Sequence, residues 1–314
     1  MKLGDMIATR DAFGEALAEC GDRDPRLVVL DADVSRSTQT YRFHERHPNR
    51  FVQCGIAEQN MMGIAAGLAA TGWHPVVSTF AVFAAKRACD QVRVSIAYPK
   101  QKVVINGAYG GVPTGKAGAT HSSVEDLAVM RAMPHMTVIT TADAVETKKA
   151  LNAALALDGP VYLRTTRCPV PVIFTEDQPF TVGRAMTLRE GSDLCLVSTG
   201  LMTARVLEAA KVLAVKGIHA RVLHVHTLKP LDEEAIVKAS VETGRIITVE
   251  NHSRIGGLGG AVAELVSERA PCRVVRMGFN DTFIESGDDE AVFTKLGLGM
   301  ERIVQTAEQT LRAD

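Results

Sequence analysis

Short runs of aliphatic and β-branched residues alternate with longer helix-like segments along this 314-residue chain. In the first half, the predicted strands are Leu27–Leu30, Pro75–Thr79, Lys102–Asn106, Thr137–Thr140 and Val161–Arg164. The predicted helices are Thr9–Cys20, Glu58–Ala70, Ala84–Ser95, Ser123–Arg131 and Ala144–Leu157. Strands that alternate with helices in this way predict a mostly parallel sheet with helices on both faces.

The same alternation resumes after a proline-rich segment, Cys168–Val172, which resembles a linker. The second set of predicted strands is Leu194–Ser198, Ala220–Val225, Arg245–Val249 and Arg273–Arg276. The helices predicted with them are Met202–Lys216, Leu231–Val241, Gly259–Ser267, Glu290–Leu296 and Glu301–Leu311. The sequence therefore predicts an α/β protein with two doubly wound domains, residues 1–178 and 186–314.

Composition narrows the classes of function. The net charge is -1 and aromatic residues make up only 5% of the chain, so neither a nucleic-acid-binding surface nor a polybasic membrane anchor is indicated. None of the six cysteines forms a Cys-x-x-Cys pair, which argues against a zinc site or a disulfide framework. No segment is apolar enough for a secretion signal or a membrane span. We expect a cytoplasmic protein without nucleic-acid or membrane partners.

Glu58 is the first candidate functional residue, because it opens a helix of small and apolar residues. Gly63, Ala66, Gly67 and Ala70 share one face of that helix and would let another backbone approach closely. An ionised carboxylate in an apolar wall costs free energy unless a basic partner meets it. Glu58 is therefore either a proton-transfer group or an acid that offsets the helix macrodipole, and its residue type alone favours the second interpretation.

Polar side chains and glycines follow the predicted strands, where ligands of open α/β sheets collect. Asp31–Ser37 follows the first strand, Phe80–Phe83 the second, and a long glycine-rich loop from Gly107 to Ser122 the third. That loop contains His121, and the spacing of Ser122 and Glu125 predicts a capping box that places His121 at a helix entrance.

The basic residues at element ends have two interpretations. Arg10, Arg164 and Arg167 could bind phosphate or merely be solvated at the surface, and surface solvation is the default for an isolated arginine. The glycines of Gly256–Gly260 suggest a tight turn before a helix rather than a dinucleotide loop, because Gly-x-Gly-x-x-Gly is absent.

Taken in order, these segments resemble the C-terminal half of transketolase, and the chain is similar to the C-terminal subunit of a split, two-chain transketolase. The matching segments are Thr9–Phe13, Asp31–Val34, Gly55–Asn60, Ser78–Phe80, Ala119–Leu127, Gly159–Arg164, Lys229–Asp232, Glu250–His252 and Gly256–Gly259. The resemblance implies a pyrimidine-binding domain followed by a transketolase C-terminal domain, and transfer of a two-carbon ketol unit between sugar phosphates.

The resemblance also implies roles for single residues. Thiamine diphosphate would be the cofactor, with Glu58 hydrogen-bonded to N1′ of its aminopyrimidine as a catalytic group. Phe80 and Phe83 would pack on the pyrimidine ring, and Asp33 and Ile56 would lie beside the cofactor. Arg10, Ser37 and Arg167 would hold a sugar phosphate, and His121 would act near the substrate hydroxyls as a catalytic and substrate-binding residue.

Two positions depart from the family pattern. Ala117 stands where transketolases have an aspartate that contacts a substrate hydroxyl, and Tyr109 stands near a second family histidine. A lost carboxylate leaves a hydroxyl without its acceptor, so the departure predicts an atypical ketose, for example a branched, deoxy or sulfonated one.

The Gly-Asp-Gly motif that holds the metal and the diphosphate in thiamine enzymes does not occur in this sequence. We therefore expect no metal ligand in this chain, an N-terminal partner subunit that carries Mg²⁺ or Ca²⁺, and an α2β2 heterotetramer. Two alternatives stay open: the β subunit of a 2-oxoacid dehydrogenase E1 component, and a non-catalytic paralogue.

Overall fold

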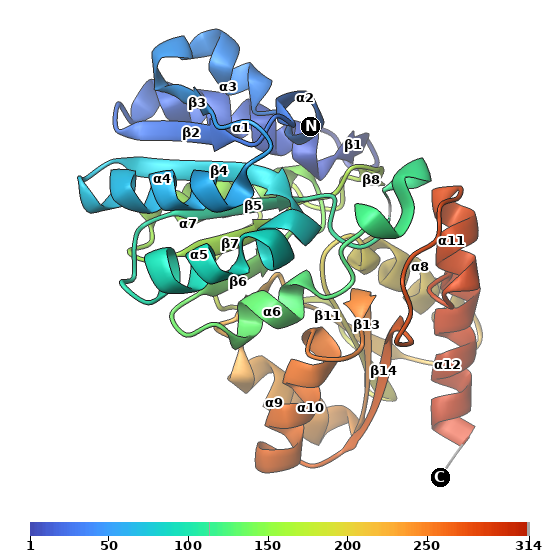
Figure 1. Ribbon diagram of the computed structural model, residues 1–314. Helices are drawn as coiled ribbons and strands as arrows, with labels where there is room; N and C mark the ends of the chain where they lie inside the picture. Colours follow the sequence, from blue (N-terminus) through green and yellow to red (C-terminus); the bar gives the residue numbers. More distant parts are fainter. Residues whose placement is uncertain (113, 313–314) are drawn as a thin grey trace.

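Seven strands form the first sheet of the computed structural model, which describes residues 1–112 and 114–312 (Figure 1). Their order across the sheet is β12-β6-β7-β5-β4-β2-β3, and all neighbours are parallel except β12 and β6. The strands are β2 (Leu27–Asp31), β3 (Phe51–Gln53), β4 (His74–Phe80), β5 (Val104–Ala108), β6 (Thr137–Thr140), β7 (Val161–Arg164) and β12 (Thr227–Lys229). β2 and β5 are buried along their whole length, as expected for strands covered on both faces.

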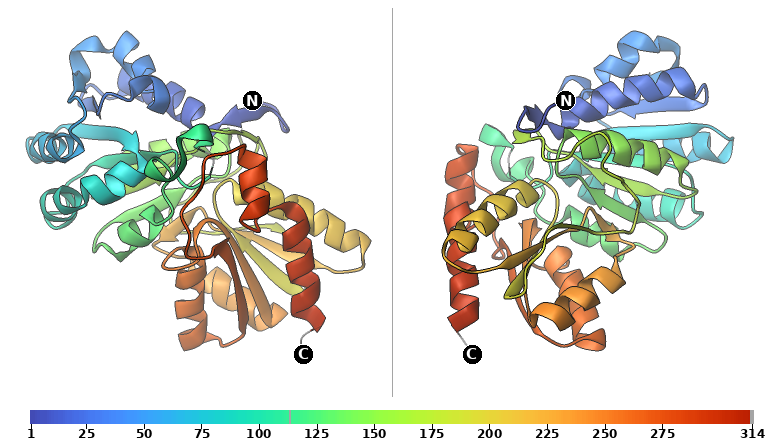
Figure 2. Two further views of the ribbon diagram at one scale, coloured as in Figure 1. Left: turned by 45° about the vertical axis from the view of Figure 1, so that its right-hand side comes forward. Right: turned by 180° about the vertical axis from the view of Figure 1, so that it is seen from behind.

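Helices cover both faces of this sheet (Figure 2). One face packs against α1 (Thr9–Arg23) and α7 (Ala144–Ala156). The other packs against α4 (Glu58–Ala70), α5 (Cys89–Gln91) and α6 (Asp126–Ala132). The predicted helix at residues 84–95 is interrupted, because α5 lies between two π-helical segments, Phe83–Arg87 and Val92–Ala97. The shorter helical segments are α2 (Ser35–Thr38), α3 (Tyr41–Arg46), and the 3₁₀ turns Pro48–Arg50 and Gly115–Thr120.

The second sheet has five strands in the order β14-β13-β10-β11-β9, with only β9 antiparallel to its neighbour. They are β9 (Met186–Arg189), β10 (Leu194–Ser198), β11 (Ala220–His224), β13 (Arg245–Ser253) and β14 (Arg273–Phe279). α8 (Met202–Val215) and α12 (Met300–Arg312) cover one face, α9 (Glu233–Thr243) and α10 (Leu258–Arg269) cover the other, and α11 (Asp289–Lys295) packs beside α8. Two parallel-type sheets with helices on both faces confirm the predicted α/β class.

The two halves are joined more closely than the sequence suggested. β12, which the sequence placed in the second domain, pairs with β6 at the edge of the first sheet. One apolar core contains Met130 and Val138 from the first half together with Leu228 and Ile236 from the second. β1 (Met6–Ala8) also pairs with β8 (Pro169–Pro171) inside the predicted linker. The division between residues 178 and 186 stays a prediction, and residues 313–314 of the second range lie outside the described part.

No helix among the described residues is both long and apolar enough to cross a membrane.

Candidate functional site

Four aromatic rings gather at the carboxyl ends of β4 and β5. Phe80 ends β4 and pairs in register with Ala108 at the end of β5, so Tyr109 follows directly beside it. The Phe80 and Tyr109 rings stack with centroids 4.6 Å apart, and Phe83 lies 5.8 Å from Phe80. His121 meets Phe80 and Phe83 edge-on at 5.7 and 5.4 Å. The structure thus brings His121 together with Phe80 and Phe83, which the sequence predicted from another segment, and Tyr109 joins them.

Glu58 lies beside this cluster at the start of α4, and its side chain is 2% exposed. Arg87 Nη1 donates to both carboxylate oxygens at 2.8 Å, while the Arg87 guanidinium lies 4.1 Å from the Phe83 ring centroid. The buried acid therefore has a basic partner, and that partner also touches the aromatic cluster. The sequence analysis missed Arg87; the signal that could have found it is the requirement that a buried carboxylate be paired.

The small-residue face of α4 does not receive another backbone within this chain. Gly63, Gly67 and Ala70 are exposed, and no described atom lies within 4 Å of a Cβ placed on either glycine. The expected close approach is therefore wrong at Gly63 and Gly67 within the single chain, although Ala66 of the same face is buried in the core.

Two arginines lie close to the side chain of Tyr109. Arg10, at the start of α1, donates through Nη1 to the Tyr109 hydroxyl and, at 3.0 Å, to the carbonyl of Ser37. The guanidinium groups of Arg10 and Arg167 lie 5.3 and 6.0 Å from the Tyr109 ring centroid. Arg10 is partly buried and Arg167 is exposed, so both can meet an anion from solvent. Arg10 and Arg167, predicted from different elements, are brought together at Tyr109, and Ser37 joins them through its backbone carbonyl, which accepts from Arg10.

Among the described residues, Asp33 and Ile56 make no contact with the rings of the cluster. Asp33 is exposed in a left-handed conformation, φ 63°, and its amide donates to Gln53 Oε1 at 2.8 Å. Val34 packs against the aromatic cluster, and the Ile56 side chain is 75% exposed. Their roles beside a cofactor therefore stay predictions.

The loop that holds Asp33 and Ser37 is shaped by a buried carboxylate, Asp31. Its oxygens accept from the Val34 amide at 2.7 Å and from the hydroxyls of Thr38 and Thr40 at 3.0 and 2.8 Å. Burial raises the pKa of Asp31, and these hydrogen bonds oppose the rise. Asp31 thus serves the site by fixing its neighbours rather than by facing it.

The predicted capping box before α6 is wrong. Ser122 Oγ donates to the carbonyl of Gly118 at 2.9 Å, and Glu125 Oε2 accepts from the Val124 amide. α6 begins at Asp126, so His121 lies at the end of a 3₁₀ turn, five residues before the helix. Thr120 Oγ1 lies 2.8 Å from His121 Nδ1 and helps to orient the ring. The Ser-x-x-Glu spacing failed because both side chains are used within the loop.

Arg164 and the Gly256–Gly260 turn have structural roles. Arg164 is 5% exposed and pairs with Asp126 instead of facing solvent. The amides of Leu258 and Gly259 at the start of α10 donate to the carboxylate of Glu250 at 2.7 and 2.8 Å. Burial raises the pKa of Glu250 to about 7. Because an internal acid already occupies this helix start, the glycines form the predicted tight turn and not a dinucleotide site.

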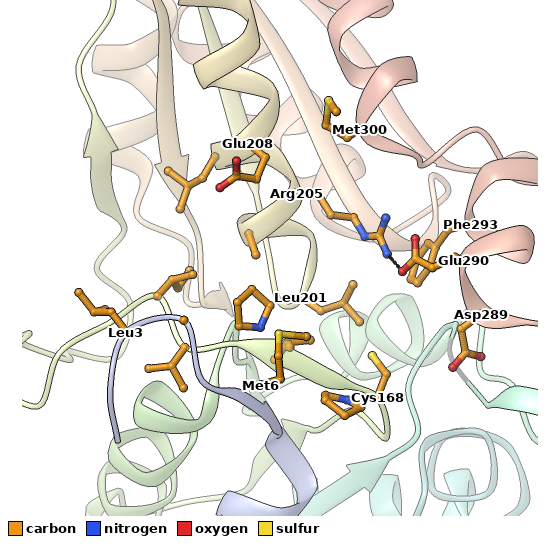
Figure 3. Close-up of a pocket in the computed structure, with 18 of the residues that line it drawn as sticks. Leu3, Met6, Cys168, Leu201, Arg205, Glu208, Asp289, Glu290, Phe293 and Met300 are labelled. Atoms are coloured by element: carbon orange, nitrogen blue, oxygen red, sulfur yellow. Dashed lines mark hydrogen bonds and ion pairs between the residues drawn. The ribbon is translucent and has the colours of Figure 1, made fainter.

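A separate cavity of about 770 Å³ lies between β8, α8 and α11 (Figure 3). Leu3, Met6, Leu201 and Phe293 supply apolar walls, and Arg205 pairs with Glu290 at its edge. None of the predicted site residues lines it. Burial raises the pKa of the Cys168 thiol in its wall to about 11, so this thiol is not an activated nucleophile.

Comparison with known proteins assigns the architecture. Residues 5–171 match the transketolase pyrimidine-binding domain, and residues 183–303 match the transketolase C-terminal domain. The chain is 43% identical over 300 residues to the 6-deoxy-6-sulfo-D-fructose transketolase subunit of Clostridium sp. strain MSTE9, covering 96% of this chain and 93% of that protein. It is 41% identical over 305 residues to an apulose-4-phosphate transketolase subunit of Phocaeicola vulgatus, covering 96% of this chain and 97% of that protein.

A solved structure described as a split gene transketolase, inactive β4 tetramer, is 47% identical to this chain. It superposes with a TM-score of 0.91 over 98% of this chain and 99% of that one. The fold is therefore that of a transketolase pyrimidine-binding domain followed by a transketolase C-terminal domain. The chain belongs to the transketolase family, and it is a C-terminal transketolase subunit with chemistry of the transketolase type.

Proposed function

We propose that Glu58, Phe80 and Phe83 form the aminopyrimidine half of a thiamine-diphosphate site. The support is a buried carboxylate joined through Arg87 to an aromatic cluster at two strand ends. A planar, nitrogen-containing ring suits both features, because aromatic faces pack on it and a protonated carboxyl group can donate a hydrogen bond to its ring nitrogen. When bound, the cofactor supplies the nucleophilic carbon and the electron sink for the two-carbon fragment.

In the absence of cofactor, Arg87 balances the charge of Glu58. Arg87 is 44% exposed, so solvent can hydrate it when it leaves, whereas the buried Glu58 needs a new hydrogen-bond partner in its place. Glu58 would then exchange the Arg87 guanidinium for the ring nitrogen N1′ and hold the proton there. Asp33 and Ile56 would border the cofactor on the solvent side.

The anion site around Tyr109 would receive the phosphate of a ketose phosphate. Arg10 and Arg167 provide the positive charge. Ser37 lies next to Arg10, which donates to the Ser37 backbone carbonyl. His121 would meet the substrate hydroxyls between this site and the cofactor. The relatives are named for 6-deoxy-6-sulfo-fructose and apulose 4-phosphate, and Ala117 removes one hydroxyl acceptor, so we infer an atypical ketose substrate.

The rest of the cofactor site would come from an N-terminal partner subunit that holds Mg²⁺ or Ca²⁺ and the diphosphate. Within residues 1–112 and 114–312, no group of three or more His, Cys, Asp or Glu side chains could hold a metal ion. The related β4 tetramer is described as inactive, which supports a need for the partner in that protein and by inference here. We propose an α2β2 assembly acting in the cytoplasm.

The decisive experiment reconstitutes the chain with its N-terminal partner and compares the wild type with Glu58→Gln. We expect kcat for ketol transfer to fall by about 10²–10⁴-fold, the range typical of a lost proton-transfer group, while the KM for the ketose phosphate changes little. Glu15→Gln is a matched control, because Glu15 is a half-exposed acid on α1 paired with Lys148. Unchanged kcat in Glu58→Gln would favour the non-catalytic paralogue, and turnover of pyruvate with lipoamide would favour a 2-oxoacid dehydrogenase.

A further inference from the structure

The C-terminal half of the chain reaches into the candidate site through one strand end. β13 continues to Ser253, four residues beyond the strand predicted from sequence. Its pairing with β14 shifts register between Val249 and Ser253, so Glu250, Asn251 and His252 leave the regular ladder. All three side chains are buried, and Ser253 then donates its amide to the carbonyl of Val124 at 2.8 Å. This stretch therefore belongs to the second sheet but contacts the loops of the first.

Asn251 uses its whole carboxamide on the loop that follows β5. Its Oδ1 accepts from the amide of Val112 at 2.9 Å, and its Nδ2 donates to the carbonyl of Gly110 at 3.2 Å and to that of Val112. The backbone of Asn251 is fixed as well, because Arg164 Nη1 donates to its main-chain carbonyl at 2.9 Å. Three backbone groups of residues 110–112 thus depend on one side chain from the other half of the chain.

Gly111 makes this close contact possible. Its φ is +70°, and a Cβ placed there would lie 2.5 Å from Asn251 Cγ, well inside contact distance. The backbone needs both the left-handed conformation and the missing side chain to fit against the carboxamide. The loop and Asn251 are therefore complementary in shape as well as in hydrogen bonding.

Residues 110–112 lie between Tyr109 and His121, the two site residues of this loop. Tyr109, immediately before this segment, stacks on Phe80 and bonds Arg10. His121 lies at the far end of the same loop, beside Phe80. Gly118, between the segment 110–112 and His121, faces Ser286, which also belongs to the C-terminal half. A loop of this length loses conformational entropy when it is fixed, so contacts at its first residues determine how well its functional side chains are placed.

We propose that Asn251 is a positioning residue of the candidate site: its carboxamide clamps Gly110–Val112 and thereby holds Tyr109 and His121 in their working places. The C-terminal half then contributes to catalysis through this loop, in addition to any part in assembly. The proposal rests on the proposed function only for its kinetic consequence, because the clamp itself is measurable without turnover.

Hydrogen exchange followed by mass spectrometry on the full chain tests the clamp directly. In Asn251→Asp, which keeps the size and one acceptor but removes both donations, we expect amides of residues 109–122 to exchange at least tenfold faster, with β10 unchanged. In the reconstituted complex, we expect kcat/KM for the ketose phosphate to fall by about tenfold or more. Wild-type exchange rates in residues 109–122 would overturn the proposal.

A matched control separates the clamp from domain contact in general. Arg131 of α6 pairs with Glu264 of α10 at 2.7 Å, a contact between the same two halves that does not touch the loop. Glu264→Gln should leave both loop exchange and kcat/KM unchanged; the same defects as in Asn251→Asp would refute a specific clamp. If Asn251→Asp does not fold, Gly111→Ala attacks the same contact from the loop side, and normal loop exchange there would equally overturn the proposal. Faster loop exchange with normal kinetics would refute the positioning role while leaving the proposed function intact.

Discussion

Replacing Asp126 by Asn tests the buried ion pair that lies under the loop after β5. Asp126 and Arg164 are 0% and 5% exposed. Arg164 Nη2 donates to Asp126 Oδ1 at 2.9 Å and Tyr162 donates to Oδ2 at 2.7 Å, while Arg164 Nε lies 2.8 Å from Oδ2 at an angle too poor for a hydrogen bond. Burial would raise the pKa of Asp126, but the charges of Arg164 and His252 and these hydrogen bonds outweigh it and lower the pKa.

The expected loss follows from the unpaired charge. Removing one partner of a buried ion pair costs about 3–5 kcal/mol, because the remaining ion stays desolvated. Asn keeps the volume and one acceptor oxygen, so we expect Asp126→Asn to lower the free energy of unfolding by about 3 kcal/mol at pH 7. Since the folded pKa of Asp126 lies below the unfolded one, the wild type should lose this advantage as the pH falls below about 4.

Urea unfolding of the full chain, followed by circular dichroism at pH 7, measures the effect. Asp158→Asn is the control, because Asp158 is 99% exposed beside Lys102 and should show no measurable change. A difference below about 1 kcal/mol between Asp126→Asn and the wild type, with an unchanged slope, would refute the reasoning and show that the pair barely offsets its own desolvation.

Two further variants probe the anion site and the junction of the halves. Tyr109→Phe removes the hydroxyl that accepts from Arg10, and we expect the KM for the ketose phosphate to rise about fivefold, matching about 1 kcal/mol, with kcat nearly unchanged in steady-state assays; a lower KM would contradict this role. Burial lowers the pKa of His226 to about 4, so the wild type should lose about 2 kcal/mol between pH 7 and 4.5 as the unfolded chain takes up the proton. His226→Phe keeps an aromatic ring beside Phe180, and in thermal melts its stability should fall by about 2 kcal/mol less than that of the wild type over this pH range. An equal fall in both proteins would exclude His226 as the cause.

The alternation of apolar runs and helices was enough to predict both sheets. β2, β5 and β10 are buried throughout, and a strand buried on both faces must be apolar along its length. Elements with few residues were missed, such as β3 at the sheet edge and β9, because three or four residues carry too little periodicity. The break of the helix at residues 84–95 into π-helical turns was also missed, since it depends on how that segment packs rather than on its composition.

Some residues of the candidate site could likewise be predicted from the sequence, and others could not. Motifs whose order resembles a known family were enough to predict a set of site residues whose roles stay proposals: Glu58, Phe80, Phe83, His121, Arg10, Ser37 and Arg167. Arg87, Tyr109 and Asn251 act through contacts between elements that lie far apart in the sequence, such as the hydrogen bond between residues 112 and 251. No local pattern encodes such a pair.

Periodicity and motif order, which are local properties, were enough to predict two α/β units and a carboxylate, Glu58, at the start of a helix. Three contacts emerged from the folded chain alone. Glu58 is paired with Arg87, Tyr109 contacts both the aromatic cluster and Arg10, and Asn251 donates to the backbone of the loop that contains His121. Buried charges and buried backbone groups must have hydrogen-bond partners. Packing of the folded chain supplies these partners, because it brings together residues that are far apart in the sequence.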